Sequence, residues 1–360
     1  MNRASTPLLT PNQREQPLET SLEELVYLYG ATYDSYLAVE PGREVFWSAD
    51  RRGFLSYARD GRYLHISGGL VAPDDVKETL LDEFLAWSGK QQCRLMFFNI
   101  VSEDVPYFAG RGFEITRWGD DQIVSLPNAT WKGKAFEWVR RQTNYATRHG
   151  LALEECSPEW MPRDAWTVLE RELCQINASA LSRRLQVREI GFLNGTLDLE
   201  HLARRRLFVA RSLETGRIDG FVICNPCRGG AEWAIDLCQQ RRDAVRGTIP
   251  FLIHQILQRL QMEGVDRASL CVVPAFQLGP ALPGESRLVR AILAASCYFR
   301  FIFDTVGMAQ FKSRFRPGSE PRYLCAHPRV TVGSMASFIG VCGALRLSPR
   351  KILRALWRRS

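Results

Sequence analysis

The chain has 360 residues, of which 46% are hydrophobic, and a formal net charge of +8. This length and composition suffice for an ordinary buried core and about two domains, at roughly 150 residues each. The longest weakly charged stretch, residues 332–345, is shorter than the ~20 residues that cross a bilayer, which argues against a transmembrane helix. The positive charge favours polyanionic partners, nucleic acid or anionic lipid.

Residues 1–20 are rich in Pro, Thr, Asn and Gln and poor in apolar residues, so we expect a disordered leader. The first forty residues contain no cationic-then-apolar signal peptide. Together with ten scattered cysteines, this predicts a cytosolic protein with reduced thiols.

The segment 21–127 predicts a first α/β unit. Its expected elements are a helix over 21–30, strands over 44–47, 53–58 and 63–67, an amphipathic helix over 74–89, an apolar strand over 94–100, and a short helix, glycine turn and strand from 105. The helix-to-strand passage at 105–114 resembles the end of a GNAT-fold acyltransferase.

A helical connection follows, within residues 128–165, and the segment 166–328 predicts a second unit. We expect strands over 207–211, 218–223 and 231–237, a helix over 249–263, a strand over 267–273, a helix over 285–295 and a final strand. The same order of elements thus occurs twice, which predicts two tandem α/β units of one type.

The only close cysteine pair is Cys224 and Cys227. A single CxxC without a second pair is a weak zinc signal, because a structural zinc site needs four ligands. The pair falls where a strand meets a Pro and Gly-Gly turn, so we interpret it as the end of a hairpin and expect no metal.

Residues 329–360 predict a basic tail, since six Lys or Arg and no Asp or Glu occur after residue 330. From residue 348 the apolar side chains recur at helical spacing, with cations on the other face. A basic amphipathic helix of this kind fits an in-plane membrane anchor, and the alternative is a solvated terminal helix packed on the body. The expected membrane residues are Ile352, Leu353, Leu356, Trp357 and Arg358.

The closing segment, residues 311–324, interleaves three aromatic rings with four cations. Rings stack on unpaired bases and cations bind phosphates, so the mixture is typical of proteins that hold single-stranded or terminal nucleotides. The alternative is a buried final strand over 322–326 preceded by a basic loop.

The closing segment, together with residues 44–50, 119–126 and 133–144, resembles the catalytic domain of bacterial phosphatidylglycerol lysyltransferases, the multiple peptide resistance factor family. The resemblance implies two GNAT-like units facing each other across a tunnel. It also implies transfer of an amino acid from aminoacyl-tRNA to a lipid hydroxyl, without a cofactor, on the inner face of a bacterial membrane.

Such a transfer needs an oriented hydroxyl, a group that accepts its proton, and stabilisation of an oxyanion. The resemblance implies catalytic roles for Asp236, Lys312 and Arg314, although Asp236 also fits a structural ion pair and either cation fits a plain surface role. The implied substrate-binding residues are Arg140, Arg141, Arg246, Gly247, Phe311, Phe315, Glu320, Arg322 and Tyr323. For the arginines of the linking helix, a solvated helix face is the alternative.

The chain departs from the family pattern near the expected centre. Gln239 stands where the family has arginine, and Pro250 stands where it has an acid. These departures leave the amino acid, the acceptor and the activity itself open. An acyl-CoA N-acyltransferase is the rival enzyme, although loop 241–248 has a single glycine where a pyrophosphate loop has more. A non-catalytic membrane-binding or RNA-binding scaffold is the third hypothesis.

Overall fold

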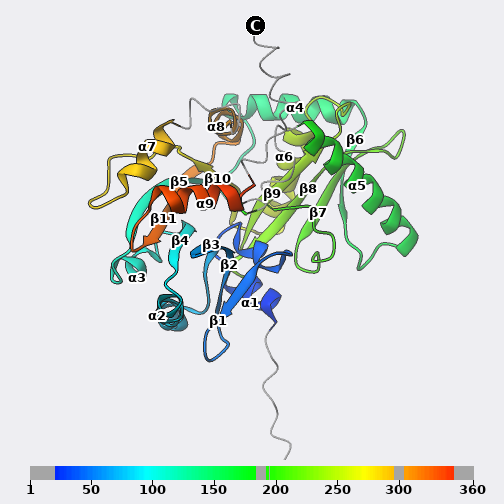
Figure 1. Cartoon of the computed structure of the whole chain (residues 1–360). Helices are drawn as coiled ribbons and strands as arrows, with labels where there is room; N and C mark the ends of the chain where they lie inside the picture. Colours follow the sequence, from blue (N-terminus) through cyan, green and yellow to red (C-terminus); the bar gives the residue numbers. More distant parts are fainter. Residues whose placement is uncertain (1–20, 184–191, 194, 296–303, 344–360) are drawn as a thin grey trace, which may run out of the picture.

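The computed structural model describes residues 21–183, 192–193, 195–295 and 304–343. A single mixed sheet runs through the whole described molecule, with helices on both of its faces (Figure 1). From edge to edge the strand order is β1-β2-β3-β4-β11-β5-β10-β9-β8-β7-β6. The expected α/β class is confirmed, and the two predicted units share this one sheet.

The strands of the first half are β1 (Glu44–Trp47), β2 (Phe54–Asp60), β3 (Tyr63–Val71), β4 (Arg94–Ile100) and β5 (Glu114–Ser125). Those of the second half are β6 (Leu151–Cys156), β7 (Arg206–Ser212), β8 (Ile218–Cys227), β9 (Glu232–Gln240), β10 (Arg267–Pro274) and β11 (Gly318–His327). The helices are α1 (Leu22–Tyr29), α2 (Asp74–Lys90), α3 (Val105–Ala109), α4 (Glu137–Arg148), α5 (Arg163–Arg183), α6 (Thr248–Met262), α7 (Arg287–Ala295), α8 (Thr305–Ser313) and α9 (Val332–Val341). The described residues also form the 3₁₀ turns η1 (Ser35–Val39), η2 (Lys134–Phe136) and η3 (Arg228–Gly230).

The two halves interlock through their last strands. The final strand β11 lies between β4 and β5, so it forms antiparallel ladders with two strands of the first half. In turn, β5 pairs with β10 of the second half. Separation of the halves would therefore break backbone hydrogen bonds between strands. This distinguishes the arrangement from two independent domains joined by a linker.

Both halves contain the same local arrangement of two parallel strands. Parallel strands pair at their beginnings and then separate: β3 with β4 only as far as Ile66, and β9 with β10 only as far as Ala234. Just beyond, the second strand of each pair has a bulge with a residue of positive φ, Asn99 at 58° and Cys271 at 67°. Bulges of this kind re-aim neighbouring side chains and are frequent beside active sites.

Alternating apolar residues along the strands produce a core on each face of the sheet. In β8, Val222 packs toward α4 and α6 while Phe221 packs toward α5. In β4, Phe97 packs toward α2 and α3 while Phe98 packs toward α7 and α9. The predicted helices and strands of both units are confirmed within a few residues, but β6, α5, α8 and α9 were not predicted from the sequence.

The closing segment is more regular than the basic loop that one interpretation of the sequence predicted before the final strand. Residues 311–313 end helix α8, and β11 begins at Gly318. In the tail, helix α9 packs on the first half, with Phe338 stacked on Phe98 at 4.2 Å between ring centroids. The predicted anchor residues lie in 344–360, outside the described residues, as does the leader 1–20. Within the described ranges, no helix is long and apolar enough to cross a membrane.

Candidate functional site

Asp236 lies at a bulge in β9, where that strand separates from β10. In the ladder with β8, Ile223 pairs with Leu237 and Cys224 with Ile235, so Asp236 is the extra residue. It also comes two residues after Ala234, the last residue of β9 to pair with β10. The carboxylate is thus placed at the gap that opens between two central strands.

Two hydrogen bonds fix the half-buried Asp236 carboxylate. Asn225 Nδ2 donates to Oδ2 at 3.1 Å, and the Gly195 amide donates to Oδ1 at 3.3 Å. Any Cβ on Gly195 would lie 2.1 Å from Oδ2, so only glycine allows this approach. Burial raises the pKa of Asp236 to about 6, against the opposing effect of the Arg205 charge. A carboxyl group with such a pKa exchanges a proton readily near neutral pH.

Lys312 reaches the same gap from helix α8. Its Nζ donates to the Cys271 carbonyl at 2.9 Å and lies 3.4 Å from the Val272 carbonyl, both in the stretch of β10 beyond its pairing with β9. Burial lowers the pKa of Lys312, while the nearby charges of Asp121 and Asp236 act in the opposite direction. The structure therefore brings together two of the three predicted catalytic residues.

Arg314, the third, lies elsewhere. It is exposed at the end of α8, with its guanidinium carbon 5.5 Å from the centre of the Trp138 ring on α4. Arg140 on the same helix donates to the Gly133 carbonyl at 2.8 Å, Arg141 is exposed, and Arg316 donates to the Ala135 carbonyl at 3.2 Å. The closing segment and the linking helix thus meet in one basic area, the α4–α8 surface (Arg140, Arg141, Arg314, Arg316 and Trp138).

Arg322 forms a buried ion pair, and Glu320 forms a partly exposed one. Arg322 is 3% exposed and donates to Asp121 at 2.9 Å, while Ser269 donates to the other Asp121 oxygen at 2.6 Å. Glu320 accepts from Arg267 at 2.6 Å. These contacts join β11, β5 and β10, so the arginine serves the interlock of the strands, and its expected contact with substrate phosphate does not fit this burial.

The aromatic residues of the closing segment are largely core residues. Phe315 is 0% exposed, which makes the expected stacking of a nucleotide on its ring wrong for this conformation. Tyr323 packs into the core of the first half. Phe311 is half-buried, in edge contact with Phe315 at 5.7 Å and with Trp138 at 6.3 Å. Only Phe311 remains available to the α4–α8 surface.

Arg246 and Gly247 precede helix α6. Gly247 is the N-cap and has φ 87°, in the left-handed region that favours glycine. A Cβ there would also meet the Gln142 side chain of α4 at 3.0 Å. The close approach of α4 and α6 therefore explains why glycine occupies position 247. The neighbouring Arg246 is exposed and extends the basic area.

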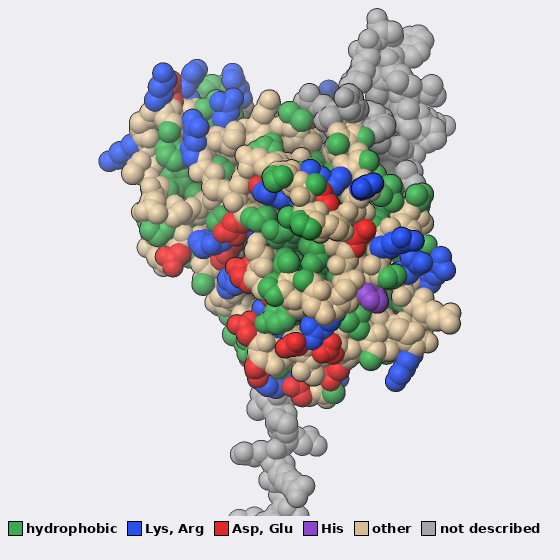
Figure 2. Space-filling model, turned by 90° about the vertical axis from the view of Figure 1, so that its left-hand side faces the viewer, with side chains coloured by type: hydrophobic (Ala, Val, Ile, Leu, Met, Phe, Trp, Pro, Cys, Tyr) green, Lys and Arg blue, Asp and Glu red, His purple; other side chains and the backbone are tan. Residues whose placement is uncertain are grey.

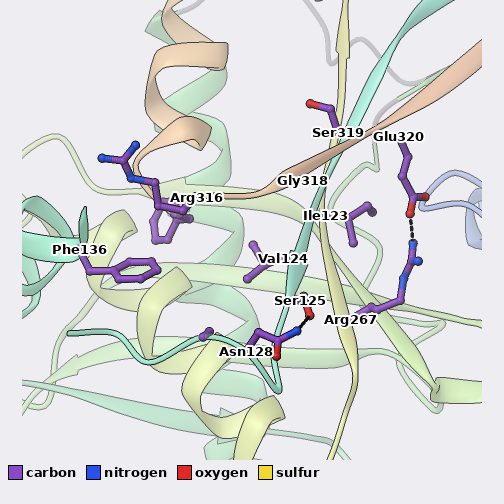
Figure 3. A pocket seen from close by; sticks show the side chains of 12 residues that line it. Ile123, Val124, Ser125, Asn128, Phe136, Arg267, Arg316, Gly318, Ser319 and Glu320 are labelled. Carbon is purple, nitrogen blue, oxygen red and sulfur yellow. Dashed lines mark hydrogen bonds and ion pairs between the residues drawn. The ribbon is translucent and has the colours of Figure 1, made fainter. Parts of the chain in front are cut away.

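A cavity of about 440 Å³ opens where β5, β10 and β11 meet (Figure 3). Glu320 and Arg267 pair on one wall, Asn128 donates to Ser125 on another, and Phe136 faces them. Arg316 points away from these groups toward solvent. The cavity thus mixes apolar side chains with polar groups that pair with one another, and it adjoins the α4–α8 surface through Arg316.

Carboxylates gather on another part of the first half. Figure 2 shows red side chains on its lower part, where α2 lies, and α2 exposes Asp74, Asp75, Glu78 and Asp82. Each of these carboxylates pairs with an Arg or Lys side chain, so much of their charge is balanced. The α4–α8 surface has four arginines beside one carboxylate of α4, Glu137, so its net charge is positive and it is the better surface for a nucleic acid.

The cysteines of the CxxC pair are buried in β8, directly before the turn η3, as the hairpin interpretation predicted. Burial raises the pKa of both thiols well above the ordinary value. Within the part of the chain that the structure describes, no cluster of three or more His, Cys, Asp or Glu side chains could hold a metal ion.

The polar residues around Asp236 were mostly missed by the sequence analysis. Asn225, Arg205, Glu40 and Tyr33 come from distant segments and carry no recognisable spacing. Asn225 lies between the two cysteines of the CxxC pair, but the sequence analysis interpreted only the cysteines. The sequence alone contains no signal that these four residues lie close together.

Comparison with known proteins decides the family. The model of the phosphatidylglycerol lysyltransferase C-terminal family matches residues 24–326. The chain belongs to this family. Among curated members, the phosphatidylglycerol lysyltransferase of Bacillus subtilis is 23% identical over 291 residues, 81% of this chain and 33% of that protein. That of Staphylococcus aureus strain MRSA252 is 20% identical over 304 residues, 84% of this chain and 35% of that protein.

The family's fold is also seen in solved structures. L-PGS from Bacillus licheniformis superposes with a TM-score of 0.75 and 22% identity, over 90% of this chain and 96% of that one. The C-terminal domain of a putative lysylphosphatidylglycerol synthetase from Agrobacterium fabrum gives 0.73 and 22%, over 91% and 95%. Thus this family member spans about a third of its curated relatives but nearly all of these solved domains.

Proposed function

We propose that this chain transfers an aminoacyl group from an aminoacyl-tRNA to the hydroxyl of a lipid such as phosphatidylglycerol. The observation that carries the proposal is the juxtaposition of Asp236 and Lys312 at the gap between β9 and β10, in a chain whose residues 24–326 belong to this family. The relatives named phosphatidylglycerol lysyltransferase support a lipid acceptor.

The chemistry is a transesterification. The lipid hydroxyl oxygen attacks the ester carbonyl carbon, a new carbon–oxygen bond forms, and the bond to the tRNA ribose oxygen breaks. Asp236 accepts the hydroxyl proton, for which a pKa of about 6 is well matched, and returns it to the departing ribose oxygen. The Lys312 ammonium stabilises the oxyanion of the tetrahedral intermediate. Neither step needs a nucleophilic side chain, because the aminoacyl ester is already activated.

The α4–α8 surface is the proposed contact for the tRNA acceptor end. Its arginines suit phosphates, and Phe311 and Trp138 offer ring edges beside them. The basic, apolar tail supports a peripheral position on the inner face of the membrane, where Ile352 to Arg358 would meet anionic lipid.

The test is a lipid transfer assay with the purified chain. The protein is incubated with vesicles containing phosphatidylglycerol and with total tRNA charged with labelled amino acids, since Gln239 and Pro250 leave the amino acid open. We expect label in the extracted lipid, and none after ribonuclease treatment of the tRNA. A product that survives ribonuclease, or that requires acetyl-CoA, would refute the tRNA-dependent reaction, and the latter would favour the rival N-acyltransferase.

A further inference from the structure

Asn225 is the most completely engaged polar side chain beside Asp236. It is 0% exposed, and its amide nitrogen donates both to Asp236 Oδ2 at 3.1 Å and to the Tyr33 carbonyl at 3.0 Å. Its amide oxygen accepts from Arg205 Nε at 2.8 Å. With both N–H groups and the oxygen in use, the amide has one orientation, and it presents a donor to Asp236.

Arg205 carries the chain of contacts onward to the first half. Its Nη2 donates to Glu40 Oε1 at 3.0 Å, with side chains 1% and 4% exposed. Glu40 follows η1 and also accepts from Thr196 Oγ1 at 2.9 Å. A continuous buried path, Glu40–Arg205–Asn225–Asp236, therefore links the amino-terminal segment to the carboxylate at the gap.

The charges along this path act on Asp236 in opposite directions. Arg205 favours the ionised carboxylate and Glu40 disfavours it. The other titratable groups that face Asp236 electrostatically are Lys312 of α8, Tyr33, and the thiols of Cys224, Cys238 and Cys271. After burial, the charge of Arg205, which lowers the pKa of Asp236, and that of Glu40, which raises it, are the two largest influences on this carboxylate.

We propose that Asn225, Arg205 and Glu40 are positioning residues that fix the orientation of the Asp236 carboxylate and set its affinity for a proton. A buried ion pair is poor at adding stability, because its desolvation cost offsets much of the attraction. Placed here, the pair instead allows the first half of the molecule to tune a carboxylate of the second. The catalytic consequence rests on the proposed function, but the effect on Asp236 does not.

The experiment measures the Asp236 proton affinity directly, by carbon-13 NMR of the full chain labelled at the aspartate carboxyl carbons. The signal that disappears in Asp236→Asn identifies the residue. Asn225→Asp places a second carboxylate against Asp236, so its pKa should rise by about one unit or more. Glu40→Gln removes a negative charge and leaves Arg205 uncompensated, so the pKa should fall by about one unit.

Two matched controls make the same chemical changes elsewhere. Gln91→Glu adds a carboxylate at the surface beside Arg59, and Glu83→Gln removes one that accepts a hydrogen bond from the Ala49 amide. Neither should move the Asp236 signal. Shifts of opposite sign in the two test variants support the proposal, whereas unchanged values, or shifts of the same sign, overturn it. Where Asn225→Asp does not fold, the downward shift in Glu40→Gln decides alone.

The same variants separate this inference from the proposed function. In the transfer assay, the acidic limb of the pH–rate profile should move with the NMR value, to higher pH in Asn225→Asp and lower pH in Glu40→Gln. A wild-type chain with no transfer activity but with the expected NMR shifts refutes the proposed function and leaves the positioning role standing. If the chain is active but the pKa of Asp236 is unchanged in both variants, the positioning role alone is refuted.

Discussion

Replacement of Asp236 by Asn should abolish transfer and yet stabilise the protein at neutral pH. Burial raises the pKa of this carboxyl from the ordinary 3.8 to about 6. Between these values the native state binds the proton more tightly than the unfolded chain, so stability falls as pH rises from about 4 to 6. At about 1.36 kcal/mol per pKa unit, ionised Asp236 costs roughly 3 kcal/mol at pH 7, as an upper limit.

The amide cannot recover all of this energy. Asn225 and Gly195 both donate to the carboxylate, and an asparagine offers one acceptor oxygen in place of two. Loss of one such bond costs about 1 kcal/mol, so the expected gain at pH 7 is about 1–2 kcal/mol. At pH 4, where Asp236 is protonated in the native state and partly protonated in the unfolded chain, most of this gain should be gone.

Urea denaturation at pH 4 and at pH 7, with the transfer assay run in parallel, checks this prediction. The diagnostic quantity is the change with pH in the stability difference between variant and wild type. A difference that is the same at both pH values would show that the native environment does not penalise the ionised carboxylate. The assignment of Asp236 as a proton acceptor with a perturbed pKa would then fail.

Three further outcomes are expected. Lys312→Met should lower kcat by at least about a hundredfold with little change in melting temperature, since oxyanion stabilisation is lost and the buried charge is removed; a smaller loss would contradict its role. Arg322→Met should destabilise the chain by about 3–5 kcal/mol, and adding Asp121→Asn should restore much of this, as measured by a double-mutant cycle; a coupling near zero would contradict the ion pair. The pair Arg314→Ala and Arg141→Ala should weaken tRNA binding and reduce the salt slope by about 2, and an unchanged slope would place the tRNA elsewhere.

Much of the secondary structure was predictable because it is locally encoded. The run from Leu95 to Phe98 is apolar throughout, as is typical of a strand covered on both faces, and it forms the middle of β4. The amphipathic pattern from Asp74 predicted α2, and the hairpin around Thr215 is present between β7 and β8. By contrast, β6 carries two glutamates and lies at the sheet edge, where an apolar pattern is not required.

The interlock of the two halves was not predictable, because the local sequences of β5 and β11 do not indicate which strands they pair with. Both strands continue the order of elements in their own unit, and chain order suggested that each closes that unit. Arg322 shows the same limit: in the sequence it is one of several cations among rings, and only its pairing with Asp121 across the interlock reveals its role. Phe315 likewise looks like a stacking ring until its burial is known.

The interlock also explains why the second half could not build this site alone. Helix α8 packs on β10, where Lys312 meets the carbonyls beyond the strand separation. The chain then leaves α8 and enters β11, which is held by ladders to β4 and β5 of the first half. On the other side of the gap, Asp236 is held by Asn225, which is bound in turn to Tyr33 of the amino-terminal segment. Asp236 is therefore held through a contact with the first half, and Lys312 through the strand that follows its helix, so loosening the first half should impair the reaction without touching either group.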